Sequence, residues 1–387
     1  MSLSRRSFVQ TLGVGATGAW IASRGREGSL FAQGIQPIQG PPPKIILSSN
    51  ENPLGCNRDV LAAISGAAFP EAGRYPFATA EEVSEIIAKK HGVKRENVLL
   101  GSGSTQILRT CTHVFTTKTA GLVAAIPAYE ECADYARLMG HPITGVKLDA
   151  NLKMDLDAMQ QASKGAGLVF YCNPNNPVAT AVTGSDTRAY LNTLMKASPG
   201  TTVLVDEAYF EYGTMPGYET MIPVAVQNPR VVVARTFSKC FGMAGIRIGY
   251  AIGHRDTIKK MADWDAVGNI SVMALQGAKA ALAVPDSWVK DEQKRNEAAR
   301  NFTQKWFADR GYTPTDSQTN FMFINIKRPA REFREACLKE GGVLIGRDFP
   351  PYEKTHVRIS IGTMDEMREA VQVFDRVLAQ PAKAAAA

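Results

Sequence analysis

Short apolar runs alternate with amphipathic segments through the middle of the chain. We predict buried strands in the apolar runs, most of which end in proline, glycine or a polar residue, at 119–127, 166–174, 201–209 and 230–236. A further short strand is predicted at 97–101, after a helix at 81–92. Apolar strands separated by helical stretches are typical of a parallel sheet covered on both faces. Because ligands of such sheets bind outside the carboxyl ends of the strands, the polar residues that follow each strand are the candidates for function.

The pattern changes beyond Gly268 to long helices, with an interruption near Pro285. Shorter elements follow, and we predict strands at 320–326 and 356–362 and helices at 329–342 and 364–379. These elements indicate a second, smaller α+β domain in an α/β protein. The predicted divisions are an N-terminal arm that joins the smaller domain, the large domain, the small C-terminal domain and a disordered tail, at 33–70, 71–284, 285–380 and 381–387.

The first 32 residues carry a different pattern from the rest of the chain. Arg5 and Arg6 precede a weakly apolar, glycine-dotted run at 11–22, and Ala32 offers a small residue for cleavage. The run is shorter than the about 20 residues that a spanning helix needs, which disfavours a membrane anchor and stable membrane insertion. The alternative is a mildly basic tail. Residues 1–32 resemble a twin-arginine (Tat) signal, which implies export of the folded protein by the Tat machinery to the bacterial periplasm.

Composition and charge narrow the function classes. The 387 residues are 45% hydrophobic, which supports a globular protein with a large core. The net charge of +7 falls to +4 for residues 33–387, which carry 40 basic and 36 acidic residues. This small surplus, without basic runs interleaved with aromatic residues, argues against a nucleic-acid partner. The six cysteines have neither a metal-like nor a disulfide-framework spacing, so we expect mostly buried, reduced thiols and no metal site.

The segment LLGSGSTQIL at 99–108 has the pattern of a strand, a glycine turn and the start of a helix. Free N–H groups at such a helix start, together with the hydroxyls of Ser104 and Thr105, are suited to a phosphate. The segment lacks the third glycine of a dinucleotide-binding turn and the Gly-Lys-Ser/Thr of a P-loop. It therefore indicates a phosphate site of another kind, although many helices begin in this way.

Later strand ends carry a ring, an amide, an acid and an amine, at Tyr129, Asn176, Asp206 and Lys239. The ring could stack on a flat ligand or simply pack, and the amide could serve a ligand or only shape a proline turn. The acid could hold Mg²⁺ in a nucleotide hydrolase, but the absence of a P-loop argues against that. A lysine usually lies on a solvated face. Lys239 instead comes just past a buried strand, with Arg247 close behind in the sequence, which indicates a role in catalysis or binding. Together with the phosphate site and the phenol of Tyr209, these groups describe pyridoxal 5′-phosphate.

The segment RTFSKCFGMAGIRIG resembles the lysine segment of the fold type I pyridoxal-phosphate enzymes, the class I and II aminotransferases. SSNENPLG, GRYPF, NPNNP, VDEAY and HVRISIGT, in this order, are similar to histidinol-phosphate aminotransferases. The resemblance covers about residues 44–378. It implies a large domain with a mostly parallel, mixed sheet flanked by helices, and a smaller α+β domain. It also implies transfer of an amino group between an amino acid or amine and a 2-oxo acid by a ping-pong reaction.

The same resemblance implies roles for individual residues. Lys239 would form the Schiff base with the cofactor and move the proton between the substrate Cα and C4′, and Asp206 would keep the pyridine nitrogen protonated. The ring would be held by Tyr129, Asn176 and Tyr209. The phosphate would be held by Ser104, Thr105, Thr236, Ser238, Arg247 and, from the partner subunit of a homodimer, Tyr75. Arg358 would bind the substrate carboxylate, with Asn52 also in the substrate site. Arg347 would either bind an acidic substrate group or form a structural ion pair.

Several positions depart from the family pattern and leave the substrate open. Val178 and Ala179 stand where many relatives have Thr-Gly, and Leu54 replaces an aromatic residue of some members. Thr105 and Gln106 stand where histidinol-phosphate enzymes often have Asp and Glu. A lyase of the β-elimination type on the same fold remains an alternative, as does a cytoplasmic histidinol-phosphate transaminase if the signal is not used. A non-catalytic periplasmic binding protein would need no lysine at this position.

Overall fold

The computed structural model describes residues 42–264 and 270–380. The predicted export signal at 1–32, most of the proline-rich arm and the predicted tail at 381–387 lie outside the described residues and stay predictions. No helix of the described ranges combines the length and the apolar character that a membrane crossing needs.

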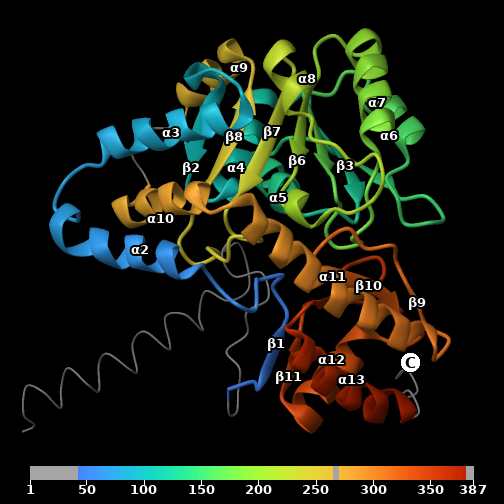
Figure 1. Ribbon diagram of the computed structural model, residues 1–387. Coiled ribbons are helices and arrows are strands. Elements are labelled where there is room, and N and C mark those ends of the chain that lie inside the picture. The colour runs from blue at the N-terminus through green and yellow to red at the C-terminus, as the bar shows by residue number, and fades with distance from the viewer. Residues whose placement is uncertain (1–41, 265–269, 381–387) are drawn as a thin grey trace, which may run out of the picture. The chain divides into compact units, whose positions relative to one another are not determined.

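A seven-stranded sheet forms the centre of the larger part of the fold (Figure 1), in the order β2-β8-β7-β6-β5-β3-β4. The strands are β2 (Val98–Gly101), β3 (Leu122–Ile126), β4 (Ile143–Lys147), β5 (Leu168–Cys172), β6 (Thr202–Asp206), β7 (Val231–Thr236) and β8 (Gly249–Gly253). Strands β4, β3, β5, β6 and β7 pair in parallel, whereas β8 is antiparallel to both β7 and β2. The predicted mostly parallel, mixed sheet is confirmed, and each apolar run chosen for a strand forms one.

Helices enclose the sheet, and every residue of β5, β6 and β7 is buried. Strands buried on both faces need continuous apolar runs, which explains why these three stood out in the sequence. The helices that lie along the sheet (Figure 1) are α3 (Phe77–His91), α4 (Ser104–Phe115), α5 (Glu131–Leu138), α6 (Leu156–Ala162), α7 (Gly184–Ala197), α8 (Ile222–Gln227) and α9 (Arg255–Ala262). Short 3₁₀ turns, η1 (Arg95–Asn97) and η2 (Phe210–Tyr212), precede β2 and follow β6.

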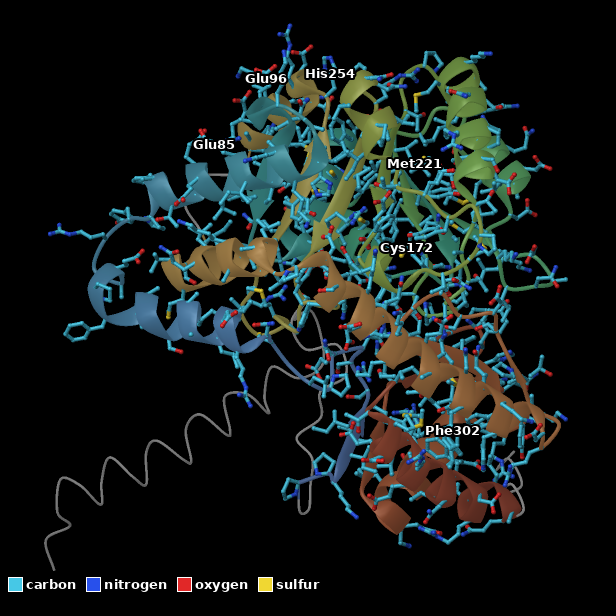
Figure 2. All side chains as sticks on the ribbon, viewed as in Figure 1. Glu85, Glu96, Cys172, Met221, His254 and Phe302 are labelled. Carbon is cyan, nitrogen blue, oxygen red and sulfur yellow. The ribbon has the colours of Figure 1, made fainter. Side chains whose placement is uncertain are left out.

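The C-terminal part has its own sheets and its own apolar cluster. Strand β1 (Ile45–Leu47) pairs in parallel with β11 (Val343–Ile345). A second sheet has the order β12-β10-β9, with neighbours antiparallel, and consists of β9 (Thr313–Pro314), β10 (Phe321–Asn325) and β12 (His356–Ser360). The helices are α11 (Asp286–Ala308), α12 (Ala330–Gly341) and α13 (Met364–Ala379). Phe302 of α11, labelled in Figure 2, packs against this apolar cluster.

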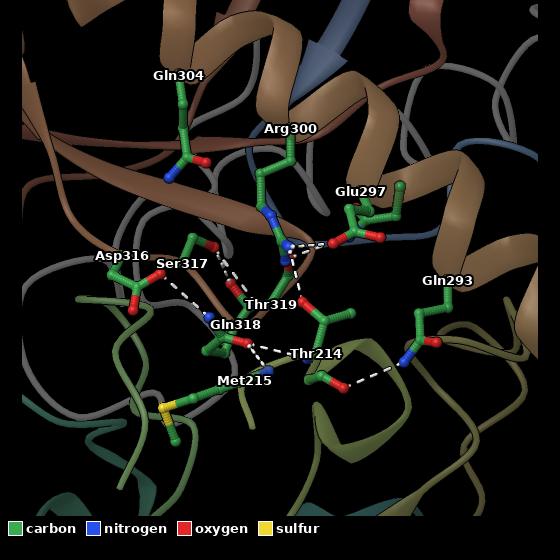
Figure 3. A network of polar contacts seen from close by, with 12 residues as sticks. Thr214, Met215, Gln293, Glu297, Arg300, Gln304, Asp316, Ser317, Gln318 and Thr319 are labelled. Carbon is green, nitrogen blue, oxygen red and sulfur yellow. Dashed lines mark hydrogen bonds and ion pairs between the residues drawn. The ribbon is translucent and has the colours of Figure 1, made fainter. Parts of the chain in front are cut away.

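A polar network connects α11 to the loop beyond η2 (Figure 3). Gln318 Oε1 accepts hydrogen bonds from the backbone N–H groups of Thr214, at 2.9 Å, and Met215, at 2.8 Å. Arg300 of α11 donates to the carbonyl of Thr319 at 3.2 Å. The network fixes the loop that follows β6 and η2 through Gln318, which comes after β9 in the sequence, while Arg300 of α11 holds the neighbouring Thr319.

Helix α2 (Arg58–Glu71) packs against α10 (Val272–Ala283), and α10 also contacts α3. Asn57 caps α2, since its Oδ1 accepts from the N–H of Asp59 at 2.8 Å. The sequence stretch between the predicted domains, at 284–285, falls between α10 and α11. Residues 45–47 of the predicted arm belong to the C-terminal sheets through β1.

Candidate active site

The carboxyl ends of parallel strands meet at one edge of the sheet, and the candidate residues follow those ends. Asp206 is the last residue of β6, and its register partners are Cys172 on β5 and Ala234 on β7. The loop with Lys239 begins directly after β7, and α4 begins just after β2. Cys172, labelled in Figure 2, lies beside Asp206, with Sγ 3.9 Å from Oδ2.

One corner of this edge forms a cradle of hydroxyls and a guanidinium. Arg247 Nη1 donates to Ser238 Oγ at 3.4 Å, and Nη2 donates to Thr105 Oγ1 at 3.5 Å. Thr236 Oγ1 accepts from the N–H of Ser238 at 3.1 Å. The cradle needs glycine at position 103, because a Cβ there would lie 2.2 Å from Arg247 Nη2.

The predicted phosphate residues of this chain are thereby brought together: Ser104, Thr105, Thr236, Ser238 and Arg247. Ser104 opens α4, so the N–H groups of a helix start face the same corner. A positive fork, hydroxyls and free helix N–H groups are the donor set that a phosphate dianion requires. The residues present therefore fit the phosphate of pyridoxal 5′-phosphate.

Asp206 is 3% exposed and has neutral hydrogen-bond partners. Its Oδ1 accepts from the N–H of Ala208 at 3.2 Å. Burial raises the pKa of this carboxyl to about 7, against the lowering effect of the Ala208 hydrogen bond. Across the described residues, no lysine or arginine lies within ion-pair distance of it. Because no cation of the described residues pairs with this buried acid, it is suited to pair with the protonated ring nitrogen of the cofactor.

Lys239 reaches the same space from the loop after β7. Its Nζ donates to the carbonyl of Ser49 at 3.3 Å and lies 5.6 Å from the centroid of the Tyr209 ring. Desolvation lowers the pKa of Lys239 to about 8, and the positive charges of Arg358 and Arg247 act in the same direction. A sizeable fraction of the amine is therefore neutral, and nucleophilic, near pH 8.

Tyr209 is positioned by a residue that the sequence interpretation did not single out. Asn50 Nδ2 donates to Tyr209 Oη at 3.1 Å, and Asn50 Oδ1 accepts from Ser360 Oγ at 2.9 Å. Asn50 is 1% exposed and has a φ of 55°, a conformation that asparagine tolerates better than most residues. It lies inside the motif SSNENPLG, which was the one signal that could have identified it.

Arg358 is buried beside Asn176. Its Nη1 donates to Asn176 Oδ1 at 2.7 Å, its Nη2 donates to the carbonyl of Ser48 at 2.7 Å, and its Nε has no hydrogen-bond partner. Burial lowers the pKa of Arg358 to about 10, so the group remains charged at neutral pH. Arg358 is therefore a buried cation that is held by neutral groups and still has one donor without a partner. This arrangement indicates a binding site for an anion.

The other substrate candidates are engaged differently. Asn52 donates through Nδ2 to the carbonyl of Cys240 at 2.9 Å and accepts from the N–H of Leu54 at 2.9 Å, so it ties the lysine loop to the arm. Of the two alternatives for Arg347, the structure has the ion pair, which it forms with Glu130. Arg347 also donates to the carbonyl of Asp348 at 3.1 Å.

Tyr129 and Tyr75 lie in contrasting environments. Tyr129 is half-buried, and burial raises its pKa to about 12, opposed by a hydrogen bond with the Thr105 side chain. This contact places the ring next to the phosphate cradle. Tyr75 is 83% exposed and stacks on Phe77 with ring centroids 5.7 Å apart. The structure therefore does not bring Tyr75 to the other candidates of its own chain.

Behind the site lies a buried ion-pair cluster that the sequence interpretation missed. Arg235 of β7 donates through Nε to Glu207 Oε2 at 2.8 Å and through Nη1 to Glu211 Oε1 at 3.2 Å. Glu207 follows Asp206 directly, and the arginine draws its carboxylate away from the site. The cluster thus leaves Asp206 as the acid at the end of β6 that faces the lysine loop.

The cysteines are free, and burial of Cys111, Cys132, Cys172, Cys240 and Cys337 confirms that most are inaccessible thiols. Cys56 is half-buried. In the described part of the chain, no group of three or more His, Cys, Asp or Glu side chains is placed to hold a metal ion.

Residues 42–374 match the family of class I and II aminotransferases. The chain is 31% identical over 337 residues to the histidinol-phosphate aminotransferase of Moorella thermoacetica, covering 87% of this chain and 86% of that protein. It is 31% identical over 344 residues to the corresponding protein of Bacillus cytotoxicus, covering 87% and 90%. The fold is similar to that of the histidinol-phosphate aminotransferase of Sinorhizobium meliloti, solved in complex with pyridoxal 5′-phosphate, with a TM-score of 0.81, 23% identity, and coverage of 92% of this chain and 99% of that one.

Proposed function

The chain belongs to the class I and II aminotransferases, and we propose that its Lys239, Asp206 and Arg358 carry out amino transfer in a pyridoxal-phosphate site at the carboxyl edge of the sheet. It is a histidinol-phosphate aminotransferase-like enzyme that uses pyridoxal 5′-phosphate. The observation that carries the proposal is the convergence of three features at one edge. These are an amine with a lowered pKa, a buried acid without a cationic partner, and a phosphate cradle.

The chain's residues hold the cofactor at three points. The cradle around Arg247 would bind the phosphate, Asp206 would keep the ring nitrogen protonated, and Tyr129, next to the cradle, would stack on the ring. Tyr209 and Asn176 would hydrogen-bond the ring hydroxyl, and Asn50 holds the phenol of Tyr209 in place. When bound, the cofactor supplies a carrier for the amino group and an acceptor for electrons from the substrate α-carbon.

Lys239 holds the cofactor between turnovers and then moves a proton at the substrate α-carbon. A base of pKa about 8 is suited to this step, because it can both accept and return a proton near neutral pH. Arg358 binds the substrate carboxylate through its charged fork, and the unpaired Nε is available for that contact. The reaction then alternates between an amino donor and a 2-oxo acid acceptor.

Stoichiometry tests this proposal against the lyase alternative. Purified holoenzyme, mixed with a panel of amino acids and no acceptor, should form one 2-oxo acid per active site and release no ammonia. Addition of a 2-oxo acid should then start continuous turnover. Continuous ammonia release without an acceptor would instead show elimination, and no reaction with any amino donor would contradict amino transfer.

We also propose a homodimer in which Tyr75 contacts the cofactor phosphate of the partner subunit. Large side chains of α2, the following turn and the start of α3 are strongly exposed: Leu61, Phe69, Tyr75 and Phe77. Phe69 is 99% exposed, which is unusual for a large apolar residue and supports a covering partner. In a C2 dimer the same patch is buried on both copies, and each subunit completes the site of the other.

Tyr75→Phe should weaken cofactor binding about tenfold, because it removes one hydrogen bond to the phosphate. Cofactor dissociation constants measured by absorbance titration check this, with the oligomeric state followed by sedimentation. Tyr135→Phe removes a hydroxyl on α5 and should leave cofactor affinity unchanged. A fully active monomeric wild type, or equal affinities for all three proteins, would contradict the proposal.

Export by the twin-arginine route is likewise proposed, on the pattern at residues 1–32. The phosphate cradle and Lys239 come from segments far apart in the sequence, so the site exists only in the folded chain, which suits export after cofactor loading. Arg5→Lys with Arg6→Lys should retain active holoenzyme in the cytoplasm. Periplasmic activity of that variant in fractionated cells would contradict the proposal.

A further inference from the structure

The ion pair between Arg347 and Glu130 lies at the substrate side of the site. Glu130 directly follows Tyr129, and Arg347 follows β11. Arg347 Nη2 donates to Glu130 Oε2, with the two side chains 29% and 31% exposed. The guanidinium carbons of Arg347 and Arg358 lie 4.4 Å and 4.6 Å from the centroid of the same Phe349 ring. The pair is thus a neighbour of the proposed carboxylate site and open to a ligand.

The two arginines differ in how their charge is balanced. Arg358 is held by the neutral oxygens of Asn176 and Ser48, so it retains an unmatched positive charge. Arg347 is matched by the carboxylate of Glu130. The neighbouring Asp348 does not compete for Arg347 through its side chain, because its carboxylate pairs with Arg331 and Arg334.

Both charges of the pair act on Arg358, the proposed binding group for the substrate carboxylate. The pKa of Arg358, lowered mainly by burial, is lowered further by Arg347 and raised by Glu130. The opposite signs mean that Glu130 opposes the effect of Arg347 on the pKa of Arg358. A substrate bound at Arg358 therefore meets one unmatched cation, together with a neutral pair.

We propose that Glu130 sets the substrate class by neutralising Arg347, so that the site accepts amino donors with an uncharged side chain and rejects donors whose side chain carries a carboxylate or phosphate. The inference rests on the proposed amino transfer and on Arg358 as the site of the α-carboxylate. An anionic side chain that reached Arg347 would meet the Glu130 carboxylate already paired with it, and two carboxylates would then lie side by side. Like charges placed together in a partly desolvated site discriminate strongly against such a ligand.

Glutamine and glutamate form a matched pair of donors, because they have nearly the same shape and differ in side-chain charge. With the wild-type holoenzyme, single-turnover conversion should be at least about tenfold more efficient for glutamine than for glutamate. Glu130→Gln should reverse or abolish this preference, chiefly through a lower apparent dissociation constant for glutamate. Glu131→Gln is the control, because the adjacent Glu131 pairs with Arg109 and should leave the preference unchanged.

Two further measurements make the result independent of turnover and of folding defects. Succinate, an unreactive dicarboxylate, should bind about tenfold more tightly to Glu130→Gln than to wild type, as followed by the cofactor absorbance. The double variant Glu130→Gln/Arg347→Gln should lose that gain, because the anion would then lack its cation.

A wild type that prefers glutamate, or a Glu130→Gln variant that gains neither glutamate conversion nor succinate affinity, would overturn the inference while leaving amino transfer intact. Absence of conversion with every amino donor would instead overturn the proposed function. In that case the succinate measurements still decide the role of Glu130.

Discussion

Replacement of Lys239 by alanine should lower turnover at least about 10³-fold while the protein still binds pyridoxal phosphate. The loss follows because Nζ of Lys239 is the amine at this edge, with a pKa lowered to about 8 by desolvation and influenced by the charges of Arg358 and Asp206. Binding should persist because the phosphate cradle around Arg247 does not involve the lysine side chain. Rapid-mixing kinetics, with cofactor content measured by absorbance, separate the two effects.

Lys259 offers a matched control for this replacement. It is exposed on α9 and pairs with Asp263 one turn later, so Lys259→Ala should leave both turnover and cofactor content unchanged. Turnover by Lys239→Ala within tenfold of wild type would contradict its assignment as the proton-transferring residue.

Asp206→Asn should have opposite effects on activity and on the stability of the cofactor-free protein. The amide cannot keep the ring nitrogen protonated, so turnover should fall by about 10²-fold or more. Single-turnover rates with a good amino donor measure this loss. Unchanged rates would show that the acid at the end of β6 does not serve the cofactor ring.

The raised pKa of Asp206 determines how its effect on stability changes with pH. Burial raises the pKa of Asp206 to about 7 in the folded chain, above the about 3.9 of an unfolded aspartate. Between these values the folded state binds more protons than the unfolded state, so the contribution of Asp206 to stability is full at low pH and is lost as pH rises through about 7. Asparagine does not ionise and avoids this loss.

The cofactor-free Asp206→Asn protein should therefore gain stability over wild type as pH rises from 5 to 8, by a few kcal/mol in the free energy of unfolding. Urea unfolding of both proteins at the two pH values measures the difference. Asp309→Asn, at an exposed pair with Lys305, should show no such growth with pH. A constant difference between wild type and Asp206→Asn would mean that the carboxyl is not desolvated.

The sequence predicts most clearly the strands that are buried along their whole length. Strands β5, β6 and β7 are buried along their whole length, so their apolar runs are continuous. Strand β4 lies at the sheet edge with Val146 as its one buried residue, so no apolar run indicated it. Strand β8 (Gly249–Gly253) begins at the last residue of the segment that resembles a lysine loop, and it lies in the sheet between β7 and the distant β2, antiparallel to both. Local patterns do not carry such pairings.

The residues of the site likewise differ in whether the local sequence could predict them. Asp206 and Lys239 could be predicted because Asp206 ends a buried strand and Lys239 comes shortly after another, where the topology of a parallel sheet places ligands. The hydrogen bond from Asn50 to Tyr209 joins residues 159 positions apart, and the Arg347–Glu130 pair spans 217 positions. Asn52 stays a predicted substrate residue, and its hydrogen bond to the carbonyl of Cys240 joins residues 188 positions apart. Such partners depend on how the C-terminal sheets and the arm meet the large sheet, which no stretch of sequence specifies alone.

Reduction of the yellow holoenzyme with borohydride, followed by proteolysis and mass mapping, tests the central claim most directly. The reagent makes the bond between the cofactor and its lysine permanent, so the attachment site can be identified. We predict that the cofactor mass lies on the peptide that contains Lys239, at one equivalent per chain. Recovery of the cofactor on another lysine, or on none, would contradict the assignment of this edge of the sheet as the active site.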